Sequence, residues 1–188
     1  MSEMRVYDER QPTQPLLTLN NSAEISKELR TIGVQFKHWA VPQDLDSSAT
    51  QDEVIEACRD VLNPLMDKHG FKSMDVISLS ADHPDKDTLR DKFLHEHTHD
   101  DFELRFFVDG SGLFNIHHEN RVYAVLCERG DLISVPAGTR HWFDMGPQPY
   151  FKAIRLFTAD QGWVANFTGD DIADQFPRLE APHYDAAA

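Results

Sequence analysis

Two short segments of the chain carry residues suited to holding a metal ion. The first, HTHDDFELRFFVDG, covers residues 97–110, and the second, GDLISVPAGTRH, covers residues 130–141. Side chains two residues apart leave a strand on the same face, so His97 and His99 can meet at one ion. Glu103 shares their parity, although the two aspartates before it can bend the chain. The first segment therefore offers two imidazoles and one carboxylate.

The second segment supplies another donor from elsewhere in the chain. Pro136 and Gly138 favour a tight turn, and His141 begins the next strand, where it can point inward. Three imidazoles and one carboxylate suit Fe(II), Ni(II), Co(II), Mn(II) or Zn(II). A His-x-His pair alone is a weak signal, since such pairs are common on solvent-facing strands and loops. The combination of both segments is far more specific.

The spacing of both segments resembles the two motifs of the cupin family. His-x-His-x3-Glu-x6-Gly is followed downstream by Gly-x5-Pro-x-Gly-x2-His. One departure is Met145, where cupins often carry an Asn that is not a metal ligand. The resemblance implies a mainly β fold, a cupin-type antiparallel barrel (jelly roll) with flanking helices mostly in the N-terminal half.

Residues 93–168 resemble the bacterial acireductone dioxygenases of methionine salvage. The resemblance implies one Fe(II) or Ni(II) per chain, held by His97, His99, Glu103 and His141. The implied substrates are 1,2-dihydroxy-3-keto-5-methylthiopentene and O2. With Fe(II) the implied products are 4-methylthio-2-oxobutanoate and formate; with Ni(II) they are 3-methylthiopropionate, formate and carbon monoxide. Bacterial relatives also suggest a monomer.

Two arginines adjoin these segments. Arg105 follows Glu103 by two residues and is expected to face the same interior. A lone inward Arg is costly unless it meets a negative partner, so either a salt bridge or an anionic substrate would satisfy it. The family resemblance implies the second role, and Arg155, flanked by apolar residues, invites the same two interpretations.

Three aromatic residues are candidates for an apolar wall of the substrate pocket: Phe93, Phe143 and Trp163. Ordinary core packing is the alternative for each of them. Phe106 and Phe107 are expected to lie on opposite sides of the sheet.

The remaining histidines near the motifs are given lesser roles. His95 has the parity of His97, so a fifth donor stays open, but we expect it to lie behind the ligands or in solvent. His117 and His118 adjoin a Glu-Asn turn and are expected to be solvated. Asp101 is expected in a turn, or supporting a ligand from behind.

Helical patterns that would support these segments concentrate in the first half of the chain. The expected helices are Ser22–Leu29, Thr50–His69 and Asp85–Phe93. Thr50 and Glu53 have capping-box spacing, and Gly70 suits the position after a helix end. Pro64 predicts a bend or break within the second helix.

From residue 72 onward, short strand-like segments alternate with turn residues. They are MDVISLS, ELRFFVDG, GLFNIHH, RVYAVLCERG, DLISVPAG, HWFDMG, YFKAIRLF and WVANF. Asp-Gly, Gly-Asp and Pro-x-Gly separate them, as in an antiparallel barrel or sandwich. We expect one domain over residues 1–188, with N-terminal helices and strands to residue 92, a metal-binding core over 93–168 and a C-terminal segment over 169–188.

Bulk composition limits the function classes. The formal charge of −14 opposes binding to nucleic acid or an anionic membrane. No apolar run reaches the roughly 20 residues of a membrane span, and no signal core is seen, so a cytoplasmic location is expected. Cys58 and Cys127 are expected to be reduced. Two alternatives remain: another cupin dioxygenase or isomerase, and a cupin that binds a metal or ligand without catalysis.

Overall fold

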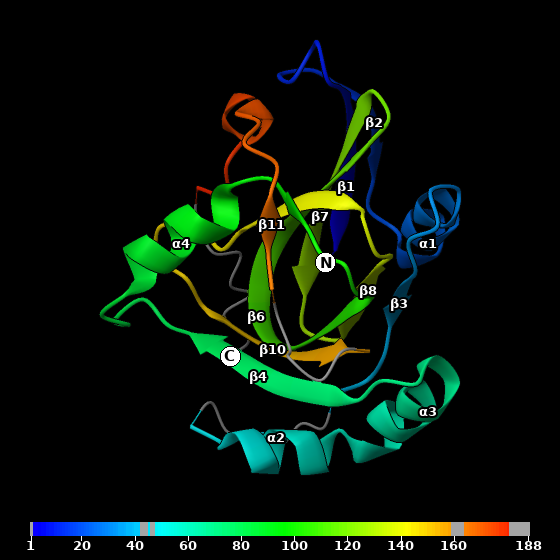
Figure 1. Cartoon of the computed structure of the whole chain (residues 1–188), viewed down its shortest axis with the longest axis vertical. Helices are drawn as coiled ribbons and strands as arrows, with labels where there is room; N and C mark the ends of the chain where they lie inside the picture. Colours follow the sequence, from blue (N-terminus) through cyan, green and yellow to red (C-terminus); the bar gives the residue numbers. More distant parts are fainter. Residues whose placement is uncertain (1, 42–44, 46–47, 159–163, 181–188) are drawn as a thin grey trace.

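The computed structural model describes residues 2–41, 45, 48–158 and 164–180, and its centre is two antiparallel sheets that share one long strand (Figure 1). The first sheet contains, in spatial order, β11 (Asn166–Phe167), β5 (His97–Thr98), β9 (Arg140–Asp144), β6 (Glu103–His118), β7 (Arg121–Glu128), β1 (Glu3–Asp8) and β2 (Pro15–Leu19). The second contains β4 (Ser73–Leu79), β10 (Phe151–Phe157), β6, β8 (Asp131–Val135) and β3 (Phe36–His38). The predicted mainly β fold with flanking helices is confirmed.

The shared strand β6 is the element that connects the two sheets. Its first half pairs with β8 and β10, and its second half pairs with β7 and β9. The predicted turn at Asp109-Gly110 is wrong, because the chain passes through it as a bulged strand. Gly110 has φ +63°, and a Cβ there would lie 1.9 Å from the carbonyl oxygen of Tyr150. Only glycine fits this left-handed position.

Strands before residue 72 also belong to the sheets. β1 pairs with β7 along six residues, and β3 pairs with β8 along three. Strands as well as helices were expected up to residue 92, but none was placed before residue 72, since short amphipathic segments such as EMRVYD give a weak period-two signal. The barrel therefore draws strands from both halves of the chain.

Four α-helices and one short 3-10 helix surround the sheets in the described part of the chain. They are α1 (Ser22–Arg30), α2 (Gln51–Ala57), α3 (Arg59–His69), α4 (Lys86–Leu94) and η1 (Ile172–Gln175). Figure 1 shows α2 and α3 on the outer side of β4, with α1 beside β3. Asn21 caps α1 through its side chain, and the predicted capping box of Thr50 and Glu53 is present.

The predicted single helix over residues 50–69 is two helices. Of the bend or break predicted at Pro64, the break is wrong. The chain departs from helical geometry at Cys58, with φ −99° and ψ 7°, and α3 begins at Arg59. Pro64 then lies inside α3, and Gly70 ends that helix in the left-handed conformation as predicted. Pro64 is the sixth residue of α3, where it has no N–H to donate to the carbonyl group four residues earlier.

Three apolar clusters hold the layers together. The largest fills the barrel and includes Phe107, Phe114 and Phe143. A second, with Phe106 and Leu104, lies between the second sheet and helices α2 and α3. The third covers the outer face of the first sheet beneath η1. Phe106 and Phe107 thus lie on opposite sides of β6, as predicted.

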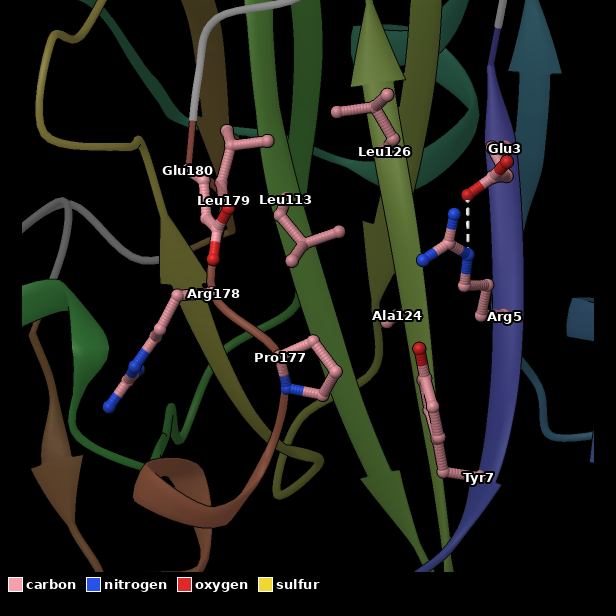
Figure 2. A pocket seen from close by; sticks show the side chains of 10 residues that line it. All are labelled: Glu3, Arg5, Tyr7, Leu113, Ala124, Leu126, Pro177, Arg178, Leu179 and Glu180. Carbon is pink, nitrogen blue, oxygen red and sulfur yellow. Dashed lines mark ion pairs between the residues drawn. The ribbon is translucent and has the colours of Figure 1, made fainter. Parts of the chain in front are cut away.

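A cavity of about 410 Å³ lies on the outer face of the first sheet, away from the histidines (Figure 2). Side chains of β1 form one wall and residues 177–180 form the other, with Leu113, Ala124 and Leu126 between them. No residue proposed for the metal site lines it. Among the described residues, no helix is both long and apolar enough to cross a bilayer.

Candidate metal centre

Three buried histidines converge inside the barrel. One ring nitrogen from each of His97, His99 and His141 lies within 4.8 Å of the other two. His97 on β5 is the direct cross-strand partner of His141 on β9, so both rings leave the same face of the sheet. His99 follows β5 by one residue. The predicted meeting of the three histidines is confirmed.

Hydrogen bonds to main-chain carbonyl groups orient all three rings. Nδ1 of His97 lies 2.8 Å from the His95 oxygen, and Nδ1 of His141 lies 2.8 Å from the Thr139 oxygen. Nδ1 of His99 lies 2.5 Å from the carbonyl oxygen of Val164. A carbonyl oxygen only accepts, so each Nδ1 carries the hydrogen and each Nε2 keeps its lone pair for a metal.

Glu103 brings a carboxylate to the same centre, and Arg105 holds it. The Arg105 Nη2 and Nε atoms donate to Oε1 of Glu103 at 2.8 and 3.2 Å. The other oxygen, Oε2, lies 3.0 Å from Nε2 of His99 and 3.9 Å from Nε2 of His141. Arg105 therefore occupies one carboxylate oxygen and leaves the second directed at the imidazoles.

The ionisation of three of these four side chains suits metal binding. Burial lowers the pKa of His97 to about 4 and that of His141 to about 3, so both rings are neutral near pH 7. Burial opposes ionisation of Glu103, but Arg105 and His99 together hold its pKa well below the usual range. Burial also disfavours charge on His99, yet its contact with Glu103 raises its pKa. The charged Glu103 carboxylate and the neutral His97 and His141 rings are already in their ligand forms, whereas a metal bound to His99 would have to displace the proton that Glu103 favours there.

The donor atoms fit a metal ion better than they fit one another. Among the described residues, Nε2 of His141 and Oε2 of Glu103 are buried without a well-aligned hydrogen-bond partner. Such atoms are costly in a protein interior. A divalent cation among them would satisfy both, and three imidazoles with one carboxylate form a borderline donor set.

Aromatic rings pack around these polar groups. The centroid of the Phe143 ring lies 4.7 Å from the guanidinium carbon of Arg105, and the ring packs edge-on against Phe93. Phe114, which the sequence interpretation did not select, stacks on His141 with ring centroids 5.3 Å apart. Phe93 and Phe143 both belong to the buried barrel core. Trp163 lies outside the described residues.

Arg155 faces Arg105 across the β6–β10 pairing, but it has its own partner. Its Nε and Nη2 atoms lie 2.8 and 2.7 Å from the two carboxylate oxygens of Asp75 on β4. This fork is the salt bridge that the sequence interpretation weighed as the alternative to a substrate contact.

Of the three other histidines near the motifs, one differs from expectation in its burial. The His95 side chain is 59% exposed beside Asp91 and stands apart from the three ligand candidates. His118 is exposed, as predicted. The prediction for His117 is wrong, because its ring is buried against Glu96 at 2.6 Å. Sequence spacing gave no sign of this contact, since Glu96 lies just before β5 and His117 lies on β6.

Comparisons with known proteins agree with this geometry. The chain matches the ARD/ARD' family over residues 3–165. It is 55% identical over 180 residues to acireductone dioxygenase of Stutzerimonas stutzeri and 54% identical to that of Pseudomonas aeruginosa UCBPP-PA14. Each match covers 96% of this chain and 99% of the relative. The structure of acireductone dioxygenase from Bacillus anthracis with a cadmium ion in its active centre has a TM-score of 0.78. It is 32% identical, and the match covers 89% of this chain and 98% of that one.

The agreement extends over nearly the whole chain. The family match contains the three clustered histidines, Glu103 and Arg105. The fold is shared with the Bacillus anthracis enzyme over 89% of this chain. The chain belongs to the ARD/ARD' family.

Proposed function

We propose that this protein is a metal-dependent acireductone dioxygenase of methionine salvage. The observation that carries the proposal is the buried cluster of His97, His99 and His141, on a scaffold whose relatives at 54% identity are named acireductone dioxygenases. The substrate is the acireductone 1,2-dihydroxy-3-keto-5-methylthiopentene, and O2 is the second substrate.

The proposed metal ligands are the three histidines and Glu103, with one Fe(II) or Ni(II) per chain. A bound divalent ion would act as Lewis acid and template for the electron-rich enediolate. The cadmium ion of the Bacillus anthracis structure supports an active-centre metal in that relative. We further propose that the protein forms 4-methylthio-2-oxobutanoate and formate when it holds Fe(II). With Ni(II) it forms 3-methylthiopropionate, formate and carbon monoxide.

Arg105 has two proposed roles that follow from one position. Its two hydrogen bonds orient Glu103, and its fixed positive charge lies where an anionic substrate would approach the histidines. Arg155 adds a second charge across the strand pair, and its proximity contributes to the lowered pKa of Arg105, after burial as the main cause. Asp75 limits Arg155 to an electrostatic role.

The proposed pocket wall consists of Phe93, Phe143 and Trp163, which would hold the methylthio tail and exclude water. The first two rings contact each other, and Phe143 also contacts Arg105. A wall that reaches the guanidinium would place the apolar tail and the charged head of one substrate side by side.

The protein is further proposed to be a cytoplasmic monomer without nucleic-acid or membrane partners. Its charge of −14 supports the absence of such partners. Both cysteines are free and buried, in keeping with a reducing compartment.

Acireductone tests the activity directly. The protein loaded with Fe(II) or with Ni(II) is mixed anaerobically with acireductone, and O2 is then admitted. We expect a spectral change on mixing, O2 consumption afterwards, and a product set that depends on the metal. No spectral change and no O2 consumption with either metal would overturn the activity. Identical products with both metals would overturn the metal dependence alone.

A further inference from the structure

Behind the metal centre, a second polar cluster is buried on the opposite face of the same strands. The side chains of Glu96 and His117 are 0% and 2% exposed, and Nδ1 of His117 lies 2.6 Å from Oε2 of Glu96. Buried charged or titratable pairs are retained at a cost in desolvation. This pair is directly linked to a proposed ligand, because Glu96 precedes His97 in the chain.

The surroundings of His117 fix its ring on both sides. Its Nε2 lies 3.1 Å from the carbonyl oxygen of Glu119 and 3.4 Å from a carboxylate oxygen of Glu9. Neither oxygen donates, so Nε2 carries a hydrogen. Glu119 has φ +53°, an unusual conformation for a residue with a side chain, and it turns its carbonyl toward the ring. A strained turn thus contributes to holding His117.

Glu96 connects this ring to a third strand. Its Oε1 atom accepts a hydrogen bond from the Thr168 hydroxyl at 3.0 Å, and its main-chain oxygen accepts from the Thr168 amide at 3.0 Å. Thr168 follows Phe167 of β11, whose ring lies 5.9 Å from that of His97. Glu96 therefore joins β5, the β6–β7 turn and the end of β11.

Strand β5 needs such a connection. It is two residues long and shares one residue pair with β9 and two with β11. Few ladder bonds thus fix the rotation of the strand that presents His97. The side chain of the preceding residue points to the opposite face, so a fixed Glu96 holds the strand from behind.

We propose that Glu96 and His117 form a positioning pair that fixes the His97 ring at the metal centre. The inference rests on the metal site of the proposed function, but not on the identity of the substrate. Residues that orient ligands from behind typically change metal affinity by about 10- to 100-fold when they are replaced.

Metal binding to the whole chain tests the pair, with Co(II) as the probe. The variants are Glu96→Ala, His117→Ala and the double variant, with affinity measured against a competing chelator and coordination read from the visible spectrum. We expect each single variant to weaken Co(II) binding by about 10- to 100-fold and to alter the spectrum. Because the two residues act as a unit, the double variant should lose no more Co(II) affinity than the single variant with the larger loss.

Asp131→Asn is the matched control. Asp131 is also a buried carboxylate paired with a histidine, at 2.9 Å from Nδ1 of His38, but it lies on β8 away from the ligands. We expect Asp131→Asn to lower the stability of the protein, while its Co(II) affinity and visible spectrum stay as in the wild type. Should Glu96→Ala fail to fold, Glu96→Gln keeps the size of the side chain but only one acceptor oxygen, and carries the same expectation.

Three results would overturn the proposed positioning role of Glu96 and His117. They are wild-type Co(II) affinity in the folded Glu96 variants, losses that multiply in the double variant, and an equal loss in Asp131→Asn. Failure of the proposed activity would look different, because the wild-type protein would then bind Co(II) normally yet leave acireductone unchanged.

Discussion

At the scale of single residues, the metal site is built mainly by hydrogen bonds that leave one atom of each side chain available. The three histidines present Nε2 because main-chain carbonyls take their Nδ1 hydrogens. Glu103 presents Oε2 because Arg105 takes Oε1. Orientation by neighbours reduces the conformational freedom that a metal would otherwise have to remove.

Removal of one donor should therefore lower metal content without loss of the fold. We expect His99→Ala or Glu103→Ala protein to retain at most a small fraction of the metal and of the activity, as measured by elemental analysis and turnover. His95→Ala is the matched control, since that ring is 59% exposed nearby, and it should keep both. Full occupancy in the His99 or Glu103 variant would show that the ligand set is wrong.

Arg105 should prove necessary for metal binding as well as turnover. Arg105→Ala leaves the buried Glu103 carboxylate without its cation, a change that typically costs about 3–5 kcal/mol. We expect lower stability in urea unfolding and weaker metal binding, because Glu103 loses its orientation. Arg105→Lys keeps the charge but not the two-atom donor fork, so it should recover stability in part and turnover poorly. Wild-type turnover in Arg105→Lys would show that turnover does not need the two-atom donor fork of arginine.

His97 and His99 were predictable because their spacing is local, whereas His141 and Glu103 were identified through the resemblance of both segments to the cupin motifs. His97 and His99 differ by two residues, and strand parity alone aligns them. The partners of Arg155 and His117 were not predictable, since Asp75 and Glu96 lie on other elements and their distance depends on sheet register. The sequence shows that an inward charge needs a partner, but not which one it meets.

At the scale of elements, β6 determines how the site is assembled. One continuous strand carries Glu103 and Arg105 in the second sheet and then His117 in the first. An Asp-Gly pair usually signals a hairpin turn, which explains why the sequence suggested two strands. The difference is tertiary: β10 and Tyr150 pack directly against Gly110.

A side chain at Gly110 should consequently destabilise the protein strongly. The left-handed conformation alone costs a non-glycine residue roughly 1–2 kcal/mol, and the contact with the Tyr150 oxygen adds to it. Gly70→Ala is the matched control, because Gly70 has φ +67° with nothing within 4 Å of the added Cβ. Urea unfolding should show a clearly larger loss for Gly110→Ala. Equal losses would mean that the close contact relaxes freely.

Helix ends were predicted more accurately than helix continuity. The capping box at Thr50 and the glycine after α3 depend on residues within four positions of the helix end. The break at Cys58 depends on how α2 and α3 each pack against the second sheet, where Val54, Leu62 and Leu65 are buried. Capping residues close in sequence identify the ends of a helix. Packing against the sheet determines where one predicted helix is interrupted.

At the scale of the whole molecule, the acidic chain brings two arginines together across neighbouring strands of the barrel. The formal charge is −14, yet Arg105 and Arg155 face each other across the β6–β10 pairing. Each is neutralised by one carboxylate, Glu103 or Asp75. Both pairs are therefore close to neutral, so the attraction for an anionic substrate would come mainly from the charge of a bound divalent ion.

The same interior should make the metal-free protein sensitive to acid. The folded pKa of His97 is about 4, lowered mainly by burial, and the ordinary value is 6.5. The unfolded chain thus binds this proton at a higher pH than the folded chain. The stability that the neutral ring contributes is complete above about pH 6.5 and is lost as the pH falls toward 4. His141 behaves alike, with a folded pKa of about 3.

Urea unfolding of chelator-treated protein between pH 7 and pH 4 measures this loss. His97→Asn is the comparison that removes the titration of this ring, together with its electrostatic effect on His99 and His141. We expect the wild type to lose up to about 3 kcal/mol more than the variant over this range, from a shift of roughly 2.5 pH units at 1.36 kcal/mol each. Parallel losses would mean that His97 is protonated within the fold. Added Co(II) should oppose the loss in the wild type, because metal and proton compete for the same Nε2 atom.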